Sequence, residues 1–431
     1  MLINKYPQKE EWTKLVQRPV LNRKELTTII QDIFSEVQKN GDQALINFNK
    51  KFDNAEIIDI QVSENEILEA EKLIGEDLKT AIQEAKKNIT KFHASQTVEV
   101  EKIETTEGVF CWRENRAIEK VGIYIPGGTA PLFSTVLMLA IPAQLAGCKE
   151  IILCSPPDKN GNINPAIFYT AQLCGVTKIF KVGGAQAVAA LTFGTESIPS
   201  VTKIFGPGNQ FVVAAKEFSQ NYGVAIDMPA GPSEVLVIAD QNAIPSFCAA
   251  DLLSQAEHGS DSQVVFISND EEVFEQTIKE IDEQVKALPR NEFAQNALEN
   301  SHFILLNSIE EAVEFSNLYA PEHLILAVEN FENYIPSIQN AGSVFLGNYS
   351  CESAGDYASG TNHTLPTNGF AKNYSGVSLD SFVKKITFQN LTKKGIQNLG
   401  KTIEIMAEAE GLFAHKNAVS IRLKQLSNVN N

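Results

Sequence analysis

Four of the six histidines in this chain lie in polar segments rich in glycine or acidic residues. The segments are Gln255-Ala-Glu-His258-Gly, Pro321-Glu322-His323, Gly-Asp356-Tyr-Ala-Ser-Gly-Thr-Asn-His363 and Glu410-Gly-Leu-Phe-Ala-His415. A neutral imidazole binds zinc and titrates near neutral pH, so such segments could supply a metal site or a proton-transfer site. Because they are far apart in sequence, a fold that united them would build one site from several loops. The other two, His93 and His302, lie in a helix-like and a strand-like stretch, and we interpret them as structural.

A metal site could use Gln255 and His258, which are three residues apart at the end of a helical stretch and therefore share a face. Asp356 and His415 would complete a set of two nitrogen and two oxygen ligands that suits zinc. The alternative is a plain helix end, where His258 interacts with the last carbonyl groups. The six cysteines are scattered without a CxxC pair, so cysteine ligation is not expected.

Glu322 and His323 follow a proline and open an apolar strand. In a turn both side chains can project into one cleft, where they would suit removal of a hydroxyl proton and activation of water. The alternative is a solvated pair at the start of a strand. Ser233, in a turn before another strand, either donates a hydrogen bond to a polar ligand or closes the turn.

Composition narrows the class of protein. The chain has 431 residues, more than one hydrophobic core usually serves, and its formal net charge is −17. This acidity argues against nucleic acid or an anionic membrane as a partner. The N-terminus lacks the apolar core of a signal peptide, and no run of about 18 apolar residues is present. We therefore expect a cytoplasmic enzyme with at least two domains.

The elements that position these residues follow two patterns. The first ~95 residues are amphipathic and helical, with a capping box at Ser63-Glu-Asn-Glu66. From residue 121 short apolar runs alternate with helical segments, which predicts parallel sheets covered by helices. The expected strands are 121–125, 150–154, 178–181, 203–205, 263–267, 303–306, 324–328 and 342–346, with another from 235. The pentapeptide Val-Thr-Lys-Ile-Phe at 176–180 and 201–205 indicates two successive βα units, unless the recurrence is chance.

The predicted fold class is α/β, with two Rossmann-like parallel-sheet domains and helical N-terminal and C-terminal extensions. The predicted boundaries are an N-terminal arm at 1–22, a first domain with the catalytic and metal residues at 23–120 and 235–378, a second domain at 121–234, and a helical tail at 379–431. The tail is amphipathic and could pack on its own core or on another subunit.

Three glycine-rich loops follow strands of the second domain: Tyr124 to Pro131, Gly183 to Gln186, and Gly206 to Asn209. Glycine lets backbone N–H groups approach a phosphate at a helix N-terminus, and loops at the carboxyl ends of parallel strands line one crevice. Each is equally consistent with a tight turn. None has the GxGxxG spacing, so the loops alone do not establish NAD binding.

Taken together, these motifs resemble the histidinol dehydrogenase family over nearly the whole chain. The motifs Tyr-Ile-Pro-Gly-Gly-Thr-Ala-Pro, Val-Gly-Gly-Ala-Gln, Gly-Pro-Gly-Asn, Gln-Ala-Glu-His-Gly, Ala-Pro-Glu-His-Leu and Gly-Asp-Tyr-Ala-Ser-Gly-Thr-Asn-His occur in the family's order. The resemblance implies oxidation of L-histidinol to L-histidine through the aldehyde, with two NAD per turnover and one zinc per site. It also implies a homodimer in which Glu410 and His415 act in the neighbouring subunit's site.

The resemblance also assigns roles to residues. Gln255, His258, Asp356 and His415 would hold zinc and contact substrate; Ser233, His363 and Glu410 would contact substrate; Tyr124, Gln186 and Asn209 would contact NAD. His323 would be the base for the alcohol and would also contact substrate, and Glu322 would activate the water that hydrates the aldehyde. Two other classes of protein stay open on the residues alone: a zinc hydrolase, which leaves the three glycine-rich loops unexplained, and a non-catalytic binder that closes on a ligand.

Overall fold

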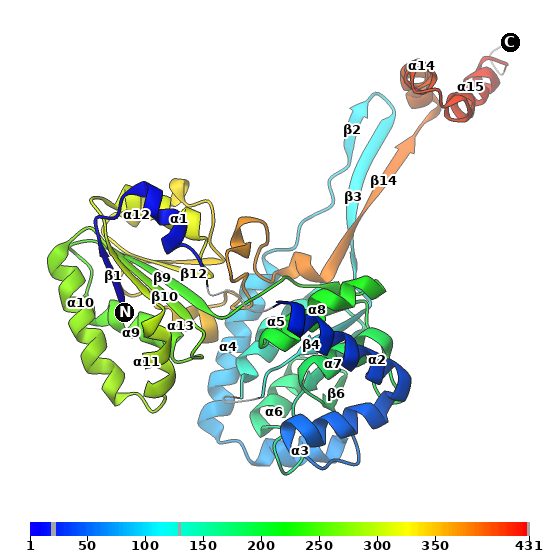
Figure 1. Cartoon of the computed structure of the whole chain (residues 1–431). Helices are drawn as coiled ribbons and strands as arrows, with labels where there is room; N and C mark the ends of the chain where they lie inside the picture. The colour runs from blue at the N-terminus through cyan, green and yellow to red at the C-terminus, as the bar shows by residue number, and fades with distance from the viewer. Residues whose placement is uncertain (19–22, 128–130, 429–431) are drawn as a thin grey trace. The chain divides into compact units, whose positions relative to one another are not determined.

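The computed structural model describes residues 1–18, 23–127 and 131–428 (Figure 1). The end of the predicted arm, 19–22, and part of the first glycine-rich loop, 128–130, lie outside the described residues. The chain forms two compact units, one of residues 1–96 and 118–382 and the other of residues 97–117 with the C-terminal residues from 383. None of the described helices combines the length and the apolar character that a membrane span requires.

One half of the first unit is a six-stranded parallel sheet, called here the six-stranded half. Its strands, in spatial order, are β1 (Leu2–Lys5), β11 (His302–Leu305), β10 (Gln263–Ser268), β9 (Glu234–Ala239), β12 (His323–Ala327) and β13 (Ser343–Leu346). Helices α9 (Pro245–Ala256), α10 (Glu271–Gln284) and α11 (Asn291–Glu299) cover one face, and α1 (Lys9–Leu15) and α12 (Ile309–Tyr319) cover the other (Figure 1). Burial on both faces explains why the central strands β9 to β12 are largely apolar runs.

The five-stranded half of the same unit is also a parallel sheet. Its order is β6 (Lys178–Lys181), β5 (Glu150–Ser155), β4 (Lys120–Tyr124), β7 (Lys203–Phe205) and β8 (Ala225–Ile226). Helices α5 (Phe133–Ala146) and α6 (Pro165–Leu173) pack on one face, and α7 (Gly184–Phe193) and α8 (Gln210–Ser219) pack on the other. The repeated pentapeptides form β6 and β7, each followed by a helix, so the prediction of two βα units is confirmed.

The packing of the N-terminal helices corrects the predicted domain boundaries. Helices α3 (Glu64–Lys72) and α4 (Glu76–Ala94) share a core with α5 and α6, and α2 (Arg23–Phe48) shares one with α7 and α8. These helices therefore belong to the five-stranded half, whereas residues 23–120 were expected to pack with 235–378. The predicted arm is also part of a sheet, because β1 pairs with β11. The sequence pattern shows a helix's apolar face but not which sheet that face will cover.

The second unit contains an antiparallel sheet that the sequence analysis did not predict. Its strands are β14 (Val383–Leu391), β3 (Val109–Ala117) and β2 (Ile103–Thr106), and they are followed by helices α14 (Lys393–Ala409) and α15 (Phe413–Asn428). The tail is thus a strand followed by two helices rather than helical from residue 379. Most side chains of β14 are exposed or half-buried, so the strand lacks the apolar run that identifies the strands of the first unit.

Candidate functional site

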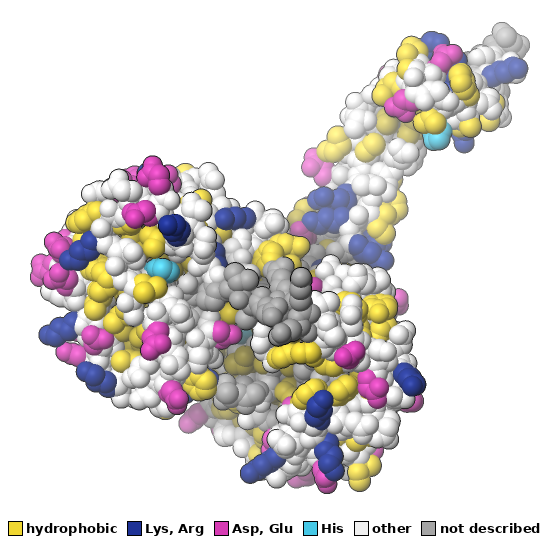
Figure 2. Space-filling model, in the orientation of Figure 1, with side chains coloured by type: hydrophobic (Ala, Val, Ile, Leu, Met, Phe, Trp, Pro, Cys, Tyr) yellow, Lys and Arg dark blue, Asp and Glu magenta, His cyan; other side chains and the backbone are white. Residues whose placement is uncertain are grey.

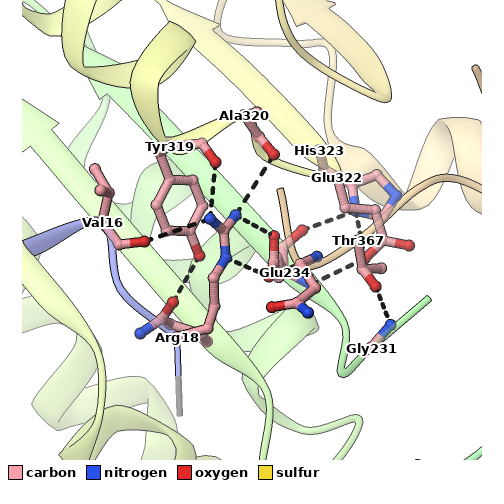
Figure 3. A network of polar contacts seen from close by, with 11 residues as sticks. Val16, Arg18, Gly231, Glu234, Tyr319, Ala320, Glu322, His323 and Thr367 are labelled. Carbon is pink, nitrogen blue, oxygen red and sulfur yellow. Dashed lines mark hydrogen bonds and ion pairs between the residues drawn. The ribbon is translucent and has the colours of Figure 1, made fainter. Parts of the chain in front are cut away.

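The site is built around Glu322 and His323, which lie where α12 ends and β12 begins. Both side chains are buried, with 6% and 4% of their surface exposed, so the alternative of a solvated pair is excluded. The neighbouring strand β9 fixes both through one residue, Glu234 (Figure 3). The backbone N–H of Glu234 donates to Oε2 of Glu322 at 2.9 Å, and the carbonyl oxygen of Glu234 lies 3.1 Å from Nδ1 of His323.

The contact with Glu234 decides which nitrogen of His323 can act as a base. A carbonyl oxygen can only accept a hydrogen bond, so Nδ1 carries a proton. Nε2 is the nitrogen that gains or loses the second proton. It is buried without a hydrogen-bond partner among the described residues and lies 3.6 Å from Oδ1 of Asp356. The geometry therefore makes Nε2 the nitrogen that exchanges a proton with the site.

Acidic side chains lie around the imidazole of His323. Oε2 of Glu322 and Oε1 of Glu352 lie 3.7 and 3.8 Å from Nδ1 of His323. Burial by itself lowers the pKa of His323, but the charges of Glu352, Glu322 and Asp356 raise that pKa well above its usual range. Burial has the opposite effect on an acid, and it raises the pKa of Glu322 to about 8. A cation bound beside these buried carboxyl groups would favour their ionised form, so the cluster is an electrostatic setting in which proteins bind a cation.

The donor atoms for a cation are present. The ligand atoms of His323, Glu352 and Asp356 lie within 4.8 Å of one another. Gln255 lies on α9, against which α13 (Glu352–Tyr357) packs, and its Oε1 is buried without a hydrogen-bond partner in the described chain. A buried amide oxygen and a buried carboxylate oxygen that nothing satisfies fit the donor set of a zinc site.

Asp356 is the point at which the predicted histidines of the first unit meet. Burial alone raises its pKa, but the charge of His323, followed by the charges of His363 and His258, lowers it below the ordinary value. His363 is held in place by two contacts, from Nδ1 to the backbone oxygen of Asp356 at 3.0 Å and from Nε2 to Oγ1 of Thr135 at 3.2 Å. The fold therefore brings together His258, His323 and His363 although up to about a hundred residues separate them.

The other residues predicted to contact substrate are divided between the two units, with Ser233 in the first and Glu410 and His415 in the second. Ser233 immediately precedes β9, and its carbonyl oxygen accepts from the backbone N–H of Gln263 at 3.1 Å, so this residue adjoins the site. Glu410 follows the last residue of α14, and His415 lies in the first turn of α15. Both side chains are exposed, and both belong to the second unit.

The glycine-rich loops of the five-stranded half meet at Tyr124, the last residue of β4. The hydroxyl of Tyr124 accepts from the backbone N–H of Gly184 at 3.1 Å. At Gly206 φ is +130°, and a β-carbon there would lie 2.2 Å from the carbonyl oxygen of Tyr124, so only glycine fits. Gln186 is buried in α7, whereas the exposed Asn209 caps α8 by accepting from the N–H groups of its first turn.

A cavity of about 610 Å³ lies at the carboxyl ends of β4 and β5 in the five-stranded sheet. Its lining includes Gly127 after β4 and Ser155 and Pro156 at the end of β5. The carboxyl ends of parallel strands are where open α/β sheets bind their ligands. The loop contacts at Tyr124 agree with the expectation that the three loops lie together. The lining of the cavity contains Gly127 and Pro131 of the first loop and residues of α3 and α6, but no residue of the second or third loop.

Two residues of the site were not predicted from the sequence: Glu352 and Glu234. A signal existed for each. Glu352 and Asp356 are four residues apart, which places them on one face of a short helix. Glu234 opens the apolar run of β9, and a carboxylate at the start of a buried strand requires a partner.

These observations define the class of protein: an α/β enzyme with a buried proton-transfer site and a set of metal-ligand atoms. Comparisons with known proteins agree. The family model described as histidinol dehydrogenase matches residues 16–423. Histidinol dehydrogenase of Bacteroides thetaiotaomicron is 57% identical over 426 residues, which cover 99% of this chain and 100% of that protein. The Yersinia pestis histidinol dehydrogenase is 50% identical over 431 residues, covering 99% and 96%.

A solved structure is similar in both sequence and fold. The crystal structure of histidinol dehydrogenase from Elizabethkingia anophelis is 64% identical, has a TM-score of 0.97, and covers 99% of each chain. The present chain therefore belongs to the histidinol dehydrogenase family and is an oxidoreductase. Membership supports oxidation of histidinol in histidine biosynthesis. The resemblance and the α/β fold class are confirmed, and the hydrolase and non-catalytic alternatives are set aside.

Proposed function

We propose that this enzyme carries out the four-electron oxidation of L-histidinol to L-histidine through L-histidinaldehyde, with NAD as the oxidant and zinc at the site. The observation that carries the proposal is the arrangement of His323, whose Nδ1 is tied to a carbonyl and whose Nε2 is free beside Asp356. Oxidation of an alcohol needs a base within hydrogen-bond reach of the hydroxyl proton, and Nε2 is suited to that task.

In the first oxidation, Nε2 of His323 would take the proton of the substrate hydroxyl, and NAD, when bound, would accept the hydride from the same carbon. In the second stage, the carboxylate of Glu322 takes a proton from the water that adds to the aldehyde carbon. The aldehyde oxygen takes up a proton to complete the hydrate, which would then lose a hydride to a second NAD and a proton to a base of the site, giving the carboxylic acid. Because Glu322 and His323 are adjacent and both buried, one site can serve both stages and keep the reactive aldehyde from bulk water.

For zinc we propose Gln255, His258 and Asp356 of one chain together with His415 of the partner subunit. The unsatisfied oxygens of Gln255 and Asp356 and the cluster of buried carboxyl groups support this set. When bound, the ion would favour the ionised form of these groups and orient the imidazole and amino nitrogens of the substrate. His323 and Glu352, whose donor atoms also cluster with Asp356, then border the ion. If Glu352→Gln lost zinc and His258→Ala retained it in elemental analysis, the cluster of His323, Glu352 and Asp356 would be the metal site instead.

For NAD we propose the loops that meet at Tyr124, with Gln186 and Asn209 as further contacts. The contacts of these loops with Tyr124 support this assignment. Ser233, His363 and Glu410 would contact L-histidinol, the last from the neighbouring subunit. All six cysteines are free thiols, which supports a reducing compartment, the cytoplasm.

A homodimer with shared sites would account for the second unit. Its two helices expose large apolar side chains, which Figure 2 shows among charged ones on α14 and α15. These exposed side chains are Ile405, Met406, Leu412, Phe413 and Ile421. Apolar surface of this kind marks protein interfaces.

We expect His258→Ala and His415→Ala to be inactive alone and to regain activity when co-expressed, because one site of the mixed dimer then holds both intact residues. Mixed dimers without activity would contradict sharing.

The stoichiometry of the reaction tests the central proposal. Incubation of the purified enzyme with L-histidinol and excess NAD should yield two NADH for each histidine formed, followed by absorbance and by chromatography of the products. Formation of one NADH with free aldehyde would overturn it. Glu322→Gln should retain the first oxidation and lose mainly the second, and full conversion by this variant at an undiminished rate would remove the role of Glu322.

A further inference from the structure

A buried ion pair between Arg18 and Glu234 adjoins the proposed catalytic residues. Nε and Nη2 of Arg18 donate to Oε1 and Oε2 of Glu234, both at 2.8 Å, which is the paired geometry in which a guanidinium binds a carboxylate most strongly (Figure 3). The side chains are 12% and 2% exposed. Oε1 of Glu234 also accepts from the backbone N–H of Asn368 at 3.0 Å. The carboxylate is thus fully engaged by groups that do not touch the site.

The same guanidinium holds the turn that leads to Glu322. Nη1 of Arg18 donates to the carbonyl oxygen of Tyr319 at 2.8 Å, and its guanidinium carbon lies 3.7 Å from the centre of the Tyr319 ring. Ala320, the next residue, adopts the left-handed conformation with φ of +56°, which is uncommon outside glycine. Arg18 therefore connects the N-terminal segment to the start of β9 and to the turn before β12.

We propose that Arg18 is a positioning residue for the reaction: through Glu234 it sets the places of Glu322 and His323. Glu234 gives its backbone N–H to Glu322 and its carbonyl to His323, and its side chain is anchored by Arg18. Arg18 lies more than two hundred residues before Glu234 in the sequence. The proposal rests on the roles proposed above for Glu322 and His323.

The physical reason is that Glu234 without Arg18 is a buried carboxylate without its counter-charge. Such a group is strongly unfavourable, so the start of β9 would move toward water or toward another donor. Any movement of that backbone displaces the N–H and the carbonyl that fix the catalytic pair. A displacement of about 1 Å at reacting groups can reduce a rate about 100-fold.

The experiment compares Arg18→Gln in the wild-type enzyme and in His323→Ala. We expect Arg18→Gln to fold by circular dichroism, to keep its zinc by elemental analysis, and to lower kcat about 100-fold with KM for L-histidinol nearly unchanged. In the His323→Ala background the same substitution should cost much less, because the main group that Arg18 positions is gone. Arg18→Lys keeps the positive charge but cannot bind both oxygens of Glu234 in the paired geometry, so its decrease in kcat should be smaller than that of Arg18→Gln.

Lys9→Gln is the matched control, since Lys9 lies in the same segment and pairs with Glu314 on α12 at an exposed position. Its kcat should be that of the wild type. A loss from Arg18→Gln that is equally large with and without His323 would overturn the positioning role and indicate a general structural one. If Arg18→Gln does not fold, Arg18→Lys in both backgrounds decides in the same way. Full activity of His323→Ala would instead refute the proposed function itself.

Discussion

The two halves of the first unit use a buried ion pair in opposite ways. In the six-stranded half, Arg18 holds the side chain of Glu234, and the backbone of Glu234 holds two reactive side chains. In the five-stranded half, the side chains of Lys216 and Asp227 pair with each other, and both bind the backbone of Gly206. Nζ of Lys216 donates to the carbonyl oxygen of Gly206, and Oδ2 of Asp227 accepts from the N–H of Gly206, both at 2.8 Å.

The difference matches the chemistry proposed for each half. Proton transfer needs side chains fixed at hydrogen-bond distances, so the six-stranded half orients an imidazole and a carboxylate. Binding of a dinucleotide needs backbone that a phosphate can approach closely, so the five-stranded half fixes a glycine loop. Each ion pair supports groups that would contact ligands without contacting a ligand itself. The predictions below test whether the two halves separate in this way.

The largest effect is expected from His323→Ala in the six-stranded half. Loss of the base should lower kcat by about 10²- to 10⁴-fold, while KM for NAD stays close to that of the wild type. Steady-state kinetics with each substrate varied in turn give both values. His302→Gln is the control, because His302 is a histidine of the same sheet that lies outside the site, and this variant should keep its rate. A raised KM for NAD with an unchanged kcat would reverse the assignment of the halves.

Lys216→Met should have the next largest effect, and it should act through stability and cofactor binding. It leaves Asp227 buried without its partner, which typically costs about 3–5 kcal/mol of unfolding free energy. Denaturant unfolding measures this loss, and KM for NAD should rise because Gly206 is no longer held. Lys149→Met removes an exposed pair with Glu119 and should change stability by less than about 1 kcal/mol. Equal stabilities of the two variants would contradict the comparison.

Gly206→Ala tests the glycine loop directly. A side chain there would meet the carbonyl oxygen of Tyr124 and would also occupy a backbone conformation that favours glycine. The loop must shift to admit the methyl group, so KM for NAD should rise by at least about tenfold, with kcat at saturating NAD preserved. Gly223→Ala is the matched control, since φ there is +81° but nothing lies within 4 Å of the added carbon. If both substitutions affect NAD equally, general strain rather than the loop is responsible.

The fold of the first unit could largely be predicted from the sequence because its strands are buried on both faces. Such strands are apolar runs that stand out between helices, and β4 to β7 and β9 to β13 begin and end within about two residues of the predictions. Strand β14 was missed because its pattern reflects a mostly exposed sheet whose partner β3 is more than two hundred and fifty residues away. Pairing over such a separation leaves no local signal.

The site was predictable where neighbouring residues carried the chemistry and not where a distant one did. Glu322 and His323 are adjacent, so their types and order alone suggested a base and a water activator. The fold brings His258 and His363 near Asp356. Their roles, like the places of Glu410 and His415 in a dimer, stay predictions. Arg18 had no signal in the sequence, because nothing near it shows that its partner is a carboxylate at the start of β9.

The smallest effect concerns a carboxylate that has no ion pair in either half. Asp251 lies on α9 one turn before Gln255, and burial raises its pKa to about 7. A carboxyl whose pKa is higher in the folded state than in the unfolded state destabilises the fold as pH rises toward that value. Asp251→Asn stays neutral, so its advantage should grow between about pH 5 and about pH 7 and then level off. We expect on the order of 1–2 kcal/mol at pH 8 in denaturant unfolding, after allowance for partial exposure.

Asp227→Asn is the counterpart of this variant, because Asp227 is paired with Lys216 and Asp251 is not. Neutralising Asp227 leaves a buried ammonium unpaired and should destabilise the protein at pH 8, the opposite sign to Asp251→Asn. The comparison of paired and unpaired carboxylates then rests on two opposite shifts measured under one condition. An advantage of Asp251→Asn that did not change with pH would show that its effect arises from packing rather than from charge.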